Sequence, residues 1–181
     1  RTIADGIAVR DANEAILNNI LEIVDEFVQV DDEEIANAVL YLLEEQKIVV
    51  EGAGAVGVAA LMNAKFKYPK EAKIGIVLSG GNIDVQMLNI IIEKGLIKSH
   101  RRMMIKVTLI DKPGALTSLT EIFKDKRSNI IKIDYDRFST SIDYGDAQIT
   151  ITLETKVKEH QDSILAELSA QGYKYENLVK E

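Results

Sequence analysis

The stretch from residue 48 to residue 61, IVVEGAGAVGVAAL, contains the glycine spacing G-x-G-x-x-G over residues 52–57. An apolar run precedes these glycines and an apolar helix follows them, which is the context in which such glycines bind a dinucleotide. That site also needs an acidic residue at the end of the next strand, but this strand ends at Ser79, and Glu71 precedes it. We therefore expect the glycines to allow a tight turn and close packing of a helix against a sheet.

A second turn, SGGN at 79–82, also follows an apolar run and precedes a helix. Open parallel sheets bind ligands at the carboxyl ends of their strands. Glu51 and Ser79 both stand at such ends, so the sequence predicts a carboxylate and a hydroxyl that are directed at one ligand. The alternatives are a helix cap for Ser79 and a structural role for Glu51.

The elements that must position these residues alternate along the first hundred residues. Asp31 and Glu34 have the spacing of a capping box at the start of a helix. The apolar periodicity predicts helices and short strands. The helices are expected over 12–23, 32–43, 52–61 and 84–94, and the strands over 27–30, 48–50 and 73–78. Such alternation favours an α/β unit with parallel strands.

The pattern changes after the polar, basic stretch at 98–102, which we interpret as a linker that includes Arg101 and Arg102. Period-two alternation then predicts strands, and helical spacing predicts helices between them. The strands are expected over 105–109, 131–135, 147–153 and 173–179, and the helices over 116–123 and 164–168, with Gly172 as a C-cap. The order βαββαβ is that of the ferredoxin-like fold. We predict two domains, residues 1–100 and 101–181.

Composition excludes several functions. Apolar residues make up 46% of the 181 residues and the net charge is −7, which suits a globular protein without a nucleic-acid or membrane partner. The chain has no cysteine and only two histidines, so disulfides, thiol catalysis and a histidine metal cage are not expected. A cytoplasmic location is the expectation. Tyr135 and Phe138 lie near one strand, but without the pattern of an RNA platform.

Three motifs, TIADG at 2–6, VVEGAGA at 49–55 and VLSGGNID at 77–84, resemble in order and spacing the C-terminal half of the catalytic domain of threonine dehydratase (threonine ammonia-lyase). This enzyme belongs to the fold-type II pyridoxal-phosphate enzymes. The second unit, with DKPG at 111–114, resembles the ACT regulatory domain that follows in that family. The resemblance covers essentially the whole chain. It implies an α/β fold, with part of a fold-type II parallel sheet followed by a ferredoxin-like ACT domain.

The resemblance assigns roles to matching positions. Ser79 matches the serine that hydrogen-bonds the pyridine nitrogen of pyridoxal 5'-phosphate, Glu51 the acidic residue beside the ring, and Gly6 a backbone contact near it. A neutral hydroxyl leaves the ring a weaker electron sink than an aspartate would, which suits elimination. The family's Schiff-base lysine, in a Ser-x-Lys motif, and its phosphate-binding glycines do not occur in these residues. We therefore expect this chain to be a fragment that is inactive alone.

The ACT resemblance implies an amino-acid effector site between two such domains. The N–H groups of Ala115 and Leu116, at the start of a helix, suit a carboxylate, and Gly114 permits close approach. Asp111 would bind the effector's ammonium, and Asn129 would add a hydrogen bond. The alternative is an ordinary turn. His160, at the start of the last helix, is expected to be a surface or capping residue.

The expected activity of the intact enzyme is conversion of L-threonine, or L-serine, to a 2-oxo acid and ammonia, which for threonine is 2-oxobutanoate. An amino acid or a nucleotide would be the effector, and ACT domains would join copies into a homo-oligomer. Two alternatives stay open. One is a standalone amino-acid-sensing ACT module, and the other is a serine dehydratase or racemase with the same motifs in the first unit.

Overall fold

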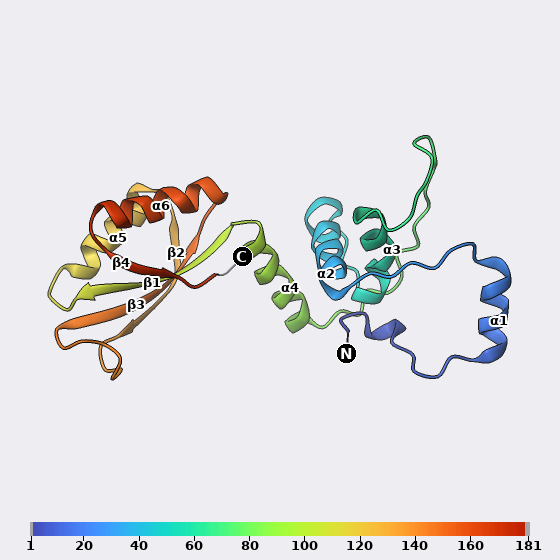
Figure 1. Ribbon diagram of the computed structural model, residues 1–181, viewed down its shortest axis with the longest axis horizontal. Helices are drawn as coiled ribbons and strands as arrows, with labels where there is room; N and C mark the ends of the chain where they lie inside the picture. The colour runs from blue at the N-terminus through green and yellow to red at the C-terminus, as the bar shows by residue number, and fades with distance from the viewer. Residues whose placement is uncertain (1, 180–181) are drawn as a thin grey trace. The chain divides into compact units, whose positions relative to one another are not determined.

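The computed structural model describes residues 2–179, which divide into two compact units. The first unit ends at Gly95 and the second begins at Leu96 (Figure 1). The division falls inside a helix, before the basic stretch at which the sequence predicts it. We describe each unit by itself.

The first unit is built from helices. They are η1 (Asp5–Ile7), α1 (Glu14–Ile23), α2 (Asp32–Tyr41), the π-helical turn η2 (Leu42–Gln46), α3 (Gly52–Met62) and α4 (Val85–Lys98). The predicted capping box is confirmed, because Asp31 Oδ1 accepts from Glu34 N at 2.8 Å and Glu34 Oε2 accepts from Asp31 N at 2.9 Å. Apolar side chains of α2, α3 and α4, among them Val39, Ala59 and Ile91, make the buried core.

The parallel sheet predicted for the first unit does not form among residues 2–95. The segments 27–30, 48–50 and 73–78 have no regular secondary structure. Their local sequence favours an extended backbone, but a strand also needs a neighbour that bonds its N–H and C=O groups. Among the described residues 2–95, no backbone bond joins these segments, and Glu51 N donates to Gly80 O at 3.2 Å just beyond the ends of two of them. Apolar side chains consequently stay outside a core, with Phe27 63% and Val77 84% exposed.

The second unit has the predicted order βαββαβ. Its elements are β1 (Arg102–Ile110), α5 (Ala115–Asp125), β2 (Asn129–Asp136), β3 (Asp146–Glu154), α6 (Lys158–Ala170) and β4 (Lys174–Asn177). The four strands pair antiparallel in the order β2-β3-β1-β4. The helices α5 and α6 cover one face of this sheet (Figure 1). This topology is the ferredoxin-like split fold.

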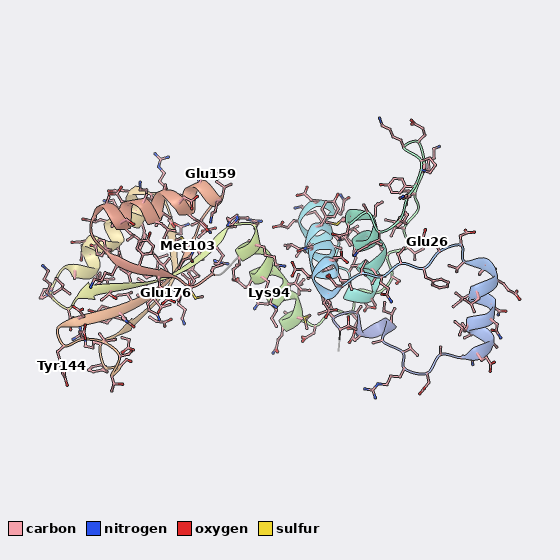
Figure 2. The ribbon with its side chains drawn as sticks, in the orientation of Figure 1. Glu26, Lys94, Met103, Tyr144, Glu159 and Glu176 are labelled. Carbon is pink, nitrogen blue, oxygen red and sulfur yellow. The ribbon has the colours of Figure 1, made fainter. Side chains whose placement is uncertain are left out.

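The core of the second unit lies between the sheet and its two helices. Every second residue of β1 and β3 is buried, and Ile105 pairs with Ile151 in register. Phe123 of α5 and Leu168 of α6 are fully buried against them. At the other extreme, Tyr144 stands fully exposed in the loop between β2 and β3 (Figure 2). The C-cap of α6 is Gln171, and the predicted glycine, Gly172, follows it with φ +79°, which is the left-handed residue that ends a helix.

Glu167 on α6 has its pKa lowered by a hydrogen bond from Gln171 Nε2 at 2.9 Å and by Lys126, whose Nζ lies 3.4 Å away. A lowered pKa stabilises the fold above the unfolded pKa, and this stability is lost as the pH falls through the folded pKa. We expect Gln171→Ala to raise the pKa of Glu167 with little change in stability, because the carboxyl is on the surface. A ¹³C NMR titration of the carboxyl carbons measures this, and an unchanged pKa would contradict it.

Candidate functional site

Three segments of the first unit meet around the Glu51 side chain. A β-carbon added at Gly80 would lie 2.3 Å from Glu51 Oε1, and one added at Gly6 would lie 3.3 Å from the same oxygen. The Glu51 backbone N–H also donates to Gly80 O at 3.2 Å. Gly6 and Gly80 therefore leave the space that the half-buried carboxylate of Glu51 occupies.

The glycines of the G-x-G-x-x-G stretch all lie within α3, which begins at Gly52. The predicted close packing of the helix is found, but against the backbone at Ile3 and Ser79 and not against a sheet. A β-carbon at Gly52 would lie 2.3 Å from Ile3 O, and one at Gly54 would lie 1.7 Å from Ser79 O. The predicted tight turn before the helix is wrong, since the glycines are in the helix itself. Backbone carbonyl oxygens fill the space beside this helix start, which is where a dinucleotide pyrophosphate would have to lie.

The backbone of Ser79 lies next to the cluster of Gly6, Glu51 and Gly80, and the Ser79 side chain is exposed. Its hydroxyl forms no hydrogen bond with any residue in the described range 2–179. The capping alternative for Ser79 is wrong, because α4 begins only at Val85 and Asp84 Oδ1 accepts from Gln86 N at 3.2 Å. The cluster thus presents the Glu51 carboxylate beside the backbones of Gly6 and Gly80. The Ser79 hydroxyl is on the residue before Gly80. These groups fit the polar edge of an aromatic ring such as pyridoxal.

In the second unit, the Asp111 carboxylate already contacts two side chains of the same unit. Its Oδ1 accepts from Tyr135 Oη at 2.9 Å and lies 3.2 Å from Arg137 Nη2. Arg137 also stacks over the Tyr135 ring at 5.3 Å from the centroid. An effector ammonium at Asp111 would therefore share the carboxylate with a guanidinium.

The start of α5 offers fewer free donors than the sequence predicts. Ala115 N donates to Lys112 O at 3.2 Å, so its N–H is not free. The N–H of Leu116 forms no hydrogen bond within residues 2–179 and is available to a ligand. Gly114 has φ +85°, a left-handed conformation that favours glycine, and no atom beyond its chain neighbours lies within 4 Å of the β-carbon position.

Asn129 lies at the opposite end of the sheet from these residues. Register places it opposite Glu154, which in turn pairs with Arg102 at the start of β1, whereas Asp111 follows the end of β1. Asn129 Nδ2 donates to Glu154 Oε2 at 2.9 Å. Within one unit, Asn129 and the turn at 111–114 are separated by the length of a strand, and they do not form one site.

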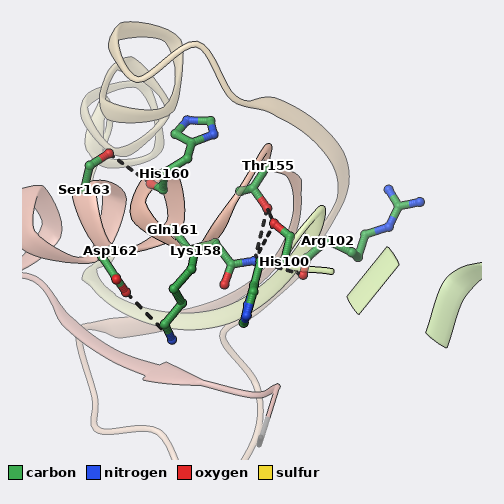
Figure 3. A network of polar contacts seen from close by, with 8 residues as sticks. All are labelled: His100, Arg102, Thr155, Lys158, His160, Gln161, Asp162 and Ser163. Atoms are coloured by element: carbon green, nitrogen blue, oxygen red, sulfur yellow. Dashed lines mark hydrogen bonds and ion pairs between the residues drawn. The ribbon is translucent and has the colours of Figure 1, made fainter. Parts of the chain in front are cut away.

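A buried polar cluster surrounds Gln161, which was not among the residues predicted from the sequence (Figure 3). The two N–H groups of Gln161 Nε2 are shared among three acceptors, His100 O at 3.1 Å, Arg102 O at 3.2 Å and Thr155 Oγ1 at 3.1 Å. Thr155 Oγ1 donates to His100 O at 2.6 Å. The signal was present, since Gln161 stands three residues before Ile164, on the apolar face of α6. The cluster fixes the entry into β1.

His160 is a capping residue, as predicted. Its Nδ1 accepts from Lys156 N at 3.2 Å, and its Nε2 lies 2.8 Å from Lys126 O at the end of α5. Because Nδ1 accepts, Nε2 carries the proton and donates. We expect His160→Phe to lower the free energy of unfolding by about 1–2 kcal/mol, since both backbone groups lose a partner. Urea denaturation measures this. A free energy of unfolding equal to that of the wild type would contradict this role of His160.

Residues 2–179 contain no cluster of three or more histidine, aspartate or glutamate side chains that could hold a metal ion. No helix in this part of the chain has the length and apolar character needed to cross a bilayer.

The pyridoxal-phosphate dependent enzyme family matches residues 1–80, the part that contains Gly6, Glu51 and Ser79. L-threonine ammonia-lyases of Thermotoga maritima and Geobacter sulfurreducens are 45% and 42% identical to this chain over 172 residues, or 95% of it. The chain spans 42% of the length of each of these relatives. The resemblance to threonine dehydratase is thus confirmed, and the cofactor of the matching family is pyridoxal phosphate.

Among solved structures, the ACT domain from GTP pyrophosphokinase of Chlorobium tepidum covers 42% of this chain and 96% of its own, with a TM-score of 0.35 and 19% identity. The prephenate dehydratase of Staphylococcus aureus covers 43% of this chain and 29% of its own, with a TM-score of 0.38 and 22% identity.

Proposed function

We propose that this chain is part of a pyridoxal-phosphate-dependent L-threonine ammonia-lyase, with the cofactor ring at Glu51 and Ser79. The observation that carries this is the meeting of Gly6, Glu51 and Gly80 within the segment that matches the family. The enzyme would convert L-threonine to 2-oxobutanoate and ammonia. When bound, pyridoxal phosphate withdraws electrons from the α-carbon of an amino acid.

The residues of this chain have positioning roles in that proposal. The Ser79 hydroxyl would donate to the pyridine nitrogen without protonating it. The Glu51 carboxylate would hold the edge of the ring, and Gly6 would let the backbone approach closely. The Schiff-base lysine must come from outside residues 1–181, because no Ser-x-Lys sequence occurs in them.

A chimera tests this function. The chain replaces the matching 172 residues of the Thermotoga maritima enzyme, and formation of 2-oxobutanoate from L-threonine is measured. We expect turnover, and a loss of at least about tenfold in Ser79→Ala, since one lost hydrogen bond of about 1.4 kcal/mol changes a rate tenfold. Ser139→Ala, in the exposed loop after β2, is the control. A chimera that binds the cofactor but leaves threonine unchanged would refute the activity. The chain alone should form no 2-oxobutanoate.

We also propose that the second unit is an ACT regulatory domain that pairs with a second copy through β2. This strand is at the sheet edge, and all of its residues are exposed. Ile130, Ile133 and Tyr135 share the apolar side of the edge, so pairing would bury them. In an antiparallel pair of β2 strands, Asn129 of one copy would lie beside the Asp111 end of the other. That arrangement would bring Asn129 and Asp111 into one effector site between the two copies. Effector binding there would then shift the activity of the enzyme.

Sedimentation of the whole chain tests the pairing. We expect a dimer that Ile133→Asp dissociates, because a charge would enter the buried edge. Val157→Asp, at an apolar and more exposed position (52% against 37% for Ile133) that precedes α6, should leave the dimer intact. A monomeric wild-type chain would refute pairing through β2.

A further inference from the structure

One carboxylate of α2 binds the segment that leads to Gly6. Asp32 Oδ1 accepts hydrogen bonds from the Thr2 hydroxyl and from Ile3 N, the second at 3.2 Å. Thr2 Oγ1 in turn accepts from Ala4 N at 3.1 Å. Three consecutive residues before η1 are therefore bonded, directly or through Thr2, to a single side chain that is remote from them in the sequence.

These bonds are not part of the cap of α2. The capping box consists of Asp31 and Glu34, each of which accepts from the backbone N–H of the other. Asp32 is the first residue of the helix, and its carboxylate accepts from residues outside α2. A carboxylate in the first turn stabilises a helix through the helix dipole without any such partner. The bonds to Thr2 and Ile3 therefore serve something other than the helix.

The same segment also contacts the start of α3. A β-carbon at Gly52 would lie 2.3 Å from Ile3 O and 3.2 Å from Ala4 N. Ala4 is buried, with 2% of its surface exposed. The backbone of residues 3 and 4 is thus in close contact with α3 and is also hydrogen-bonded to the start of α2.

The position of Gly6 depends on these contacts, because Gly6 is only two residues after Ala4. A β-carbon at Gly6 would lie 3.2 Å from Ala53 Cβ and 3.3 Å from Glu51 Oε1. A shift of the segment along α3 would therefore move the Gly6 backbone relative to the Glu51 carboxylate. Groups that bind a cofactor must be held to within about 0.5 Å, which requires hydrogen bonds from the surrounding structure.

We propose that Asp32 is a positioning residue for the cofactor site. It holds residues 2–4 so that the Gly6 backbone lies beside the Glu51 carboxylate, and it acts through Thr2 and Ile3 and not by contact with the cofactor. The proposal rests on the proposed function for the identity of the cofactor alone.

Amide hydrogen exchange of the whole chain tests the hydrogen bonds without any cofactor. Asp32→Ala removes the acceptor of Thr2 and Ile3, and we expect the amides of Ile3 and Ala4 to exchange at least about tenfold faster. Asp32→Asn keeps an oxygen acceptor at the same place and should retain most of the protection. The α2 amides, measured in the same experiment, show whether the helix is intact in each variant.

The dissociation constant for pyridoxal phosphate, measured on the chimera, tests the role in the site. We expect Asp32→Ala to raise it about tenfold, since the Gly6 backbone would no longer be held beside the ring, and Asp32→Asn to raise it less than about threefold. Asp31→Ala is the matched control. It removes the cap from the same turn of α2 but leaves the bonds to Thr2 and Ile3, so the dissociation constant should stay as in the wild type.

Two results would overturn the proposal. One is an equal loss of affinity in Asp31→Ala and Asp32→Ala, which would show that Asp32 acts only through the stability of α2. The other is unchanged exchange at Ile3 and Ala4 in Asp32→Ala. A wild-type chimera that binds no pyridoxal phosphate would instead refute the proposed function, and the exchange experiment would still decide whether Asp32 holds the segment.

Discussion

Gly54→Ala should destabilise the first unit by about 3 kcal/mol or more. Alanine is favoured over glycine by about 1 kcal/mol inside a helix, so propensity alone predicts a gain. The structure predicts a loss of stability instead, because the new β-carbon would lie 1.7 Å from Ser79 O and 2.7 Å from Val50 Cγ1. The first of these is backbone, so relief requires α3 to move away from the segment around Ser79. Hydrogen exchange of the α2 and α3 amides measures the loss.

The matched control is Gly75→Ala. Nothing lies within 4 Å of the β-carbon position at Gly75, and its backbone has an ordinary φ. We expect protection of α2 and α3 to stay as in wild type. Equal protection in Gly54→Ala and Gly75→Ala would show that the contact at Ser79 does not limit the packing. In the chimera, Gly54→Ala should also weaken cofactor binding, since it displaces Ser79 from Glu51.

Gln161→Leu should lower the free energy of unfolding of the second unit by about 2 kcal/mol. Leucine fits the apolar face of α6, so burial alone predicts a gain. The substitution instead removes the donor to Arg102 O and one of two donors to His100 O, and a buried acceptor without its partner costs about 1–3 kcal/mol. Urea unfolding followed by exchange of the β1 and β3 amides measures this.

Gln171→Leu provides the comparison for the same change of residue type. Gln171 is exposed at the end of α6, and its side chain bonds only Glu167. We expect a change within about 0.5 kcal/mol, as for most surface substitutions. If Gln161→Leu were as stable as Gln171→Leu, the three hydrogen bonds of Gln161 would contribute nothing net to the fold.

The sequence by itself determined the features that depend on near neighbours in the chain. Alternation of apolar residues in 105–109 and 147–153 defined two central strands, because period two puts one face in the core. The capping box at Asp31 and the glycine after α6 were equally local, since their hydrogen bonds join residues a few positions apart. The motifs that contain Glu51 and Ser79 could also be identified from the sequence, because each motif is one continuous stretch of the chain.

Only the tertiary structure decided which distant segments meet. The apolar runs at 27–30 and 73–78 do not become strands here, because a ladder needs a partner that periodicity does not supply. Asn129 and Asp111 were predicted to bind one effector between two domains, and the antiparallel register decides that within one unit they lie at opposite ends of the sheet. The role of Gln161 depends on carbonyl groups some sixty residues earlier in the chain. Local patterns fix backbone conformation and the buried face, whereas contacts between remote groups follow from how the elements pack.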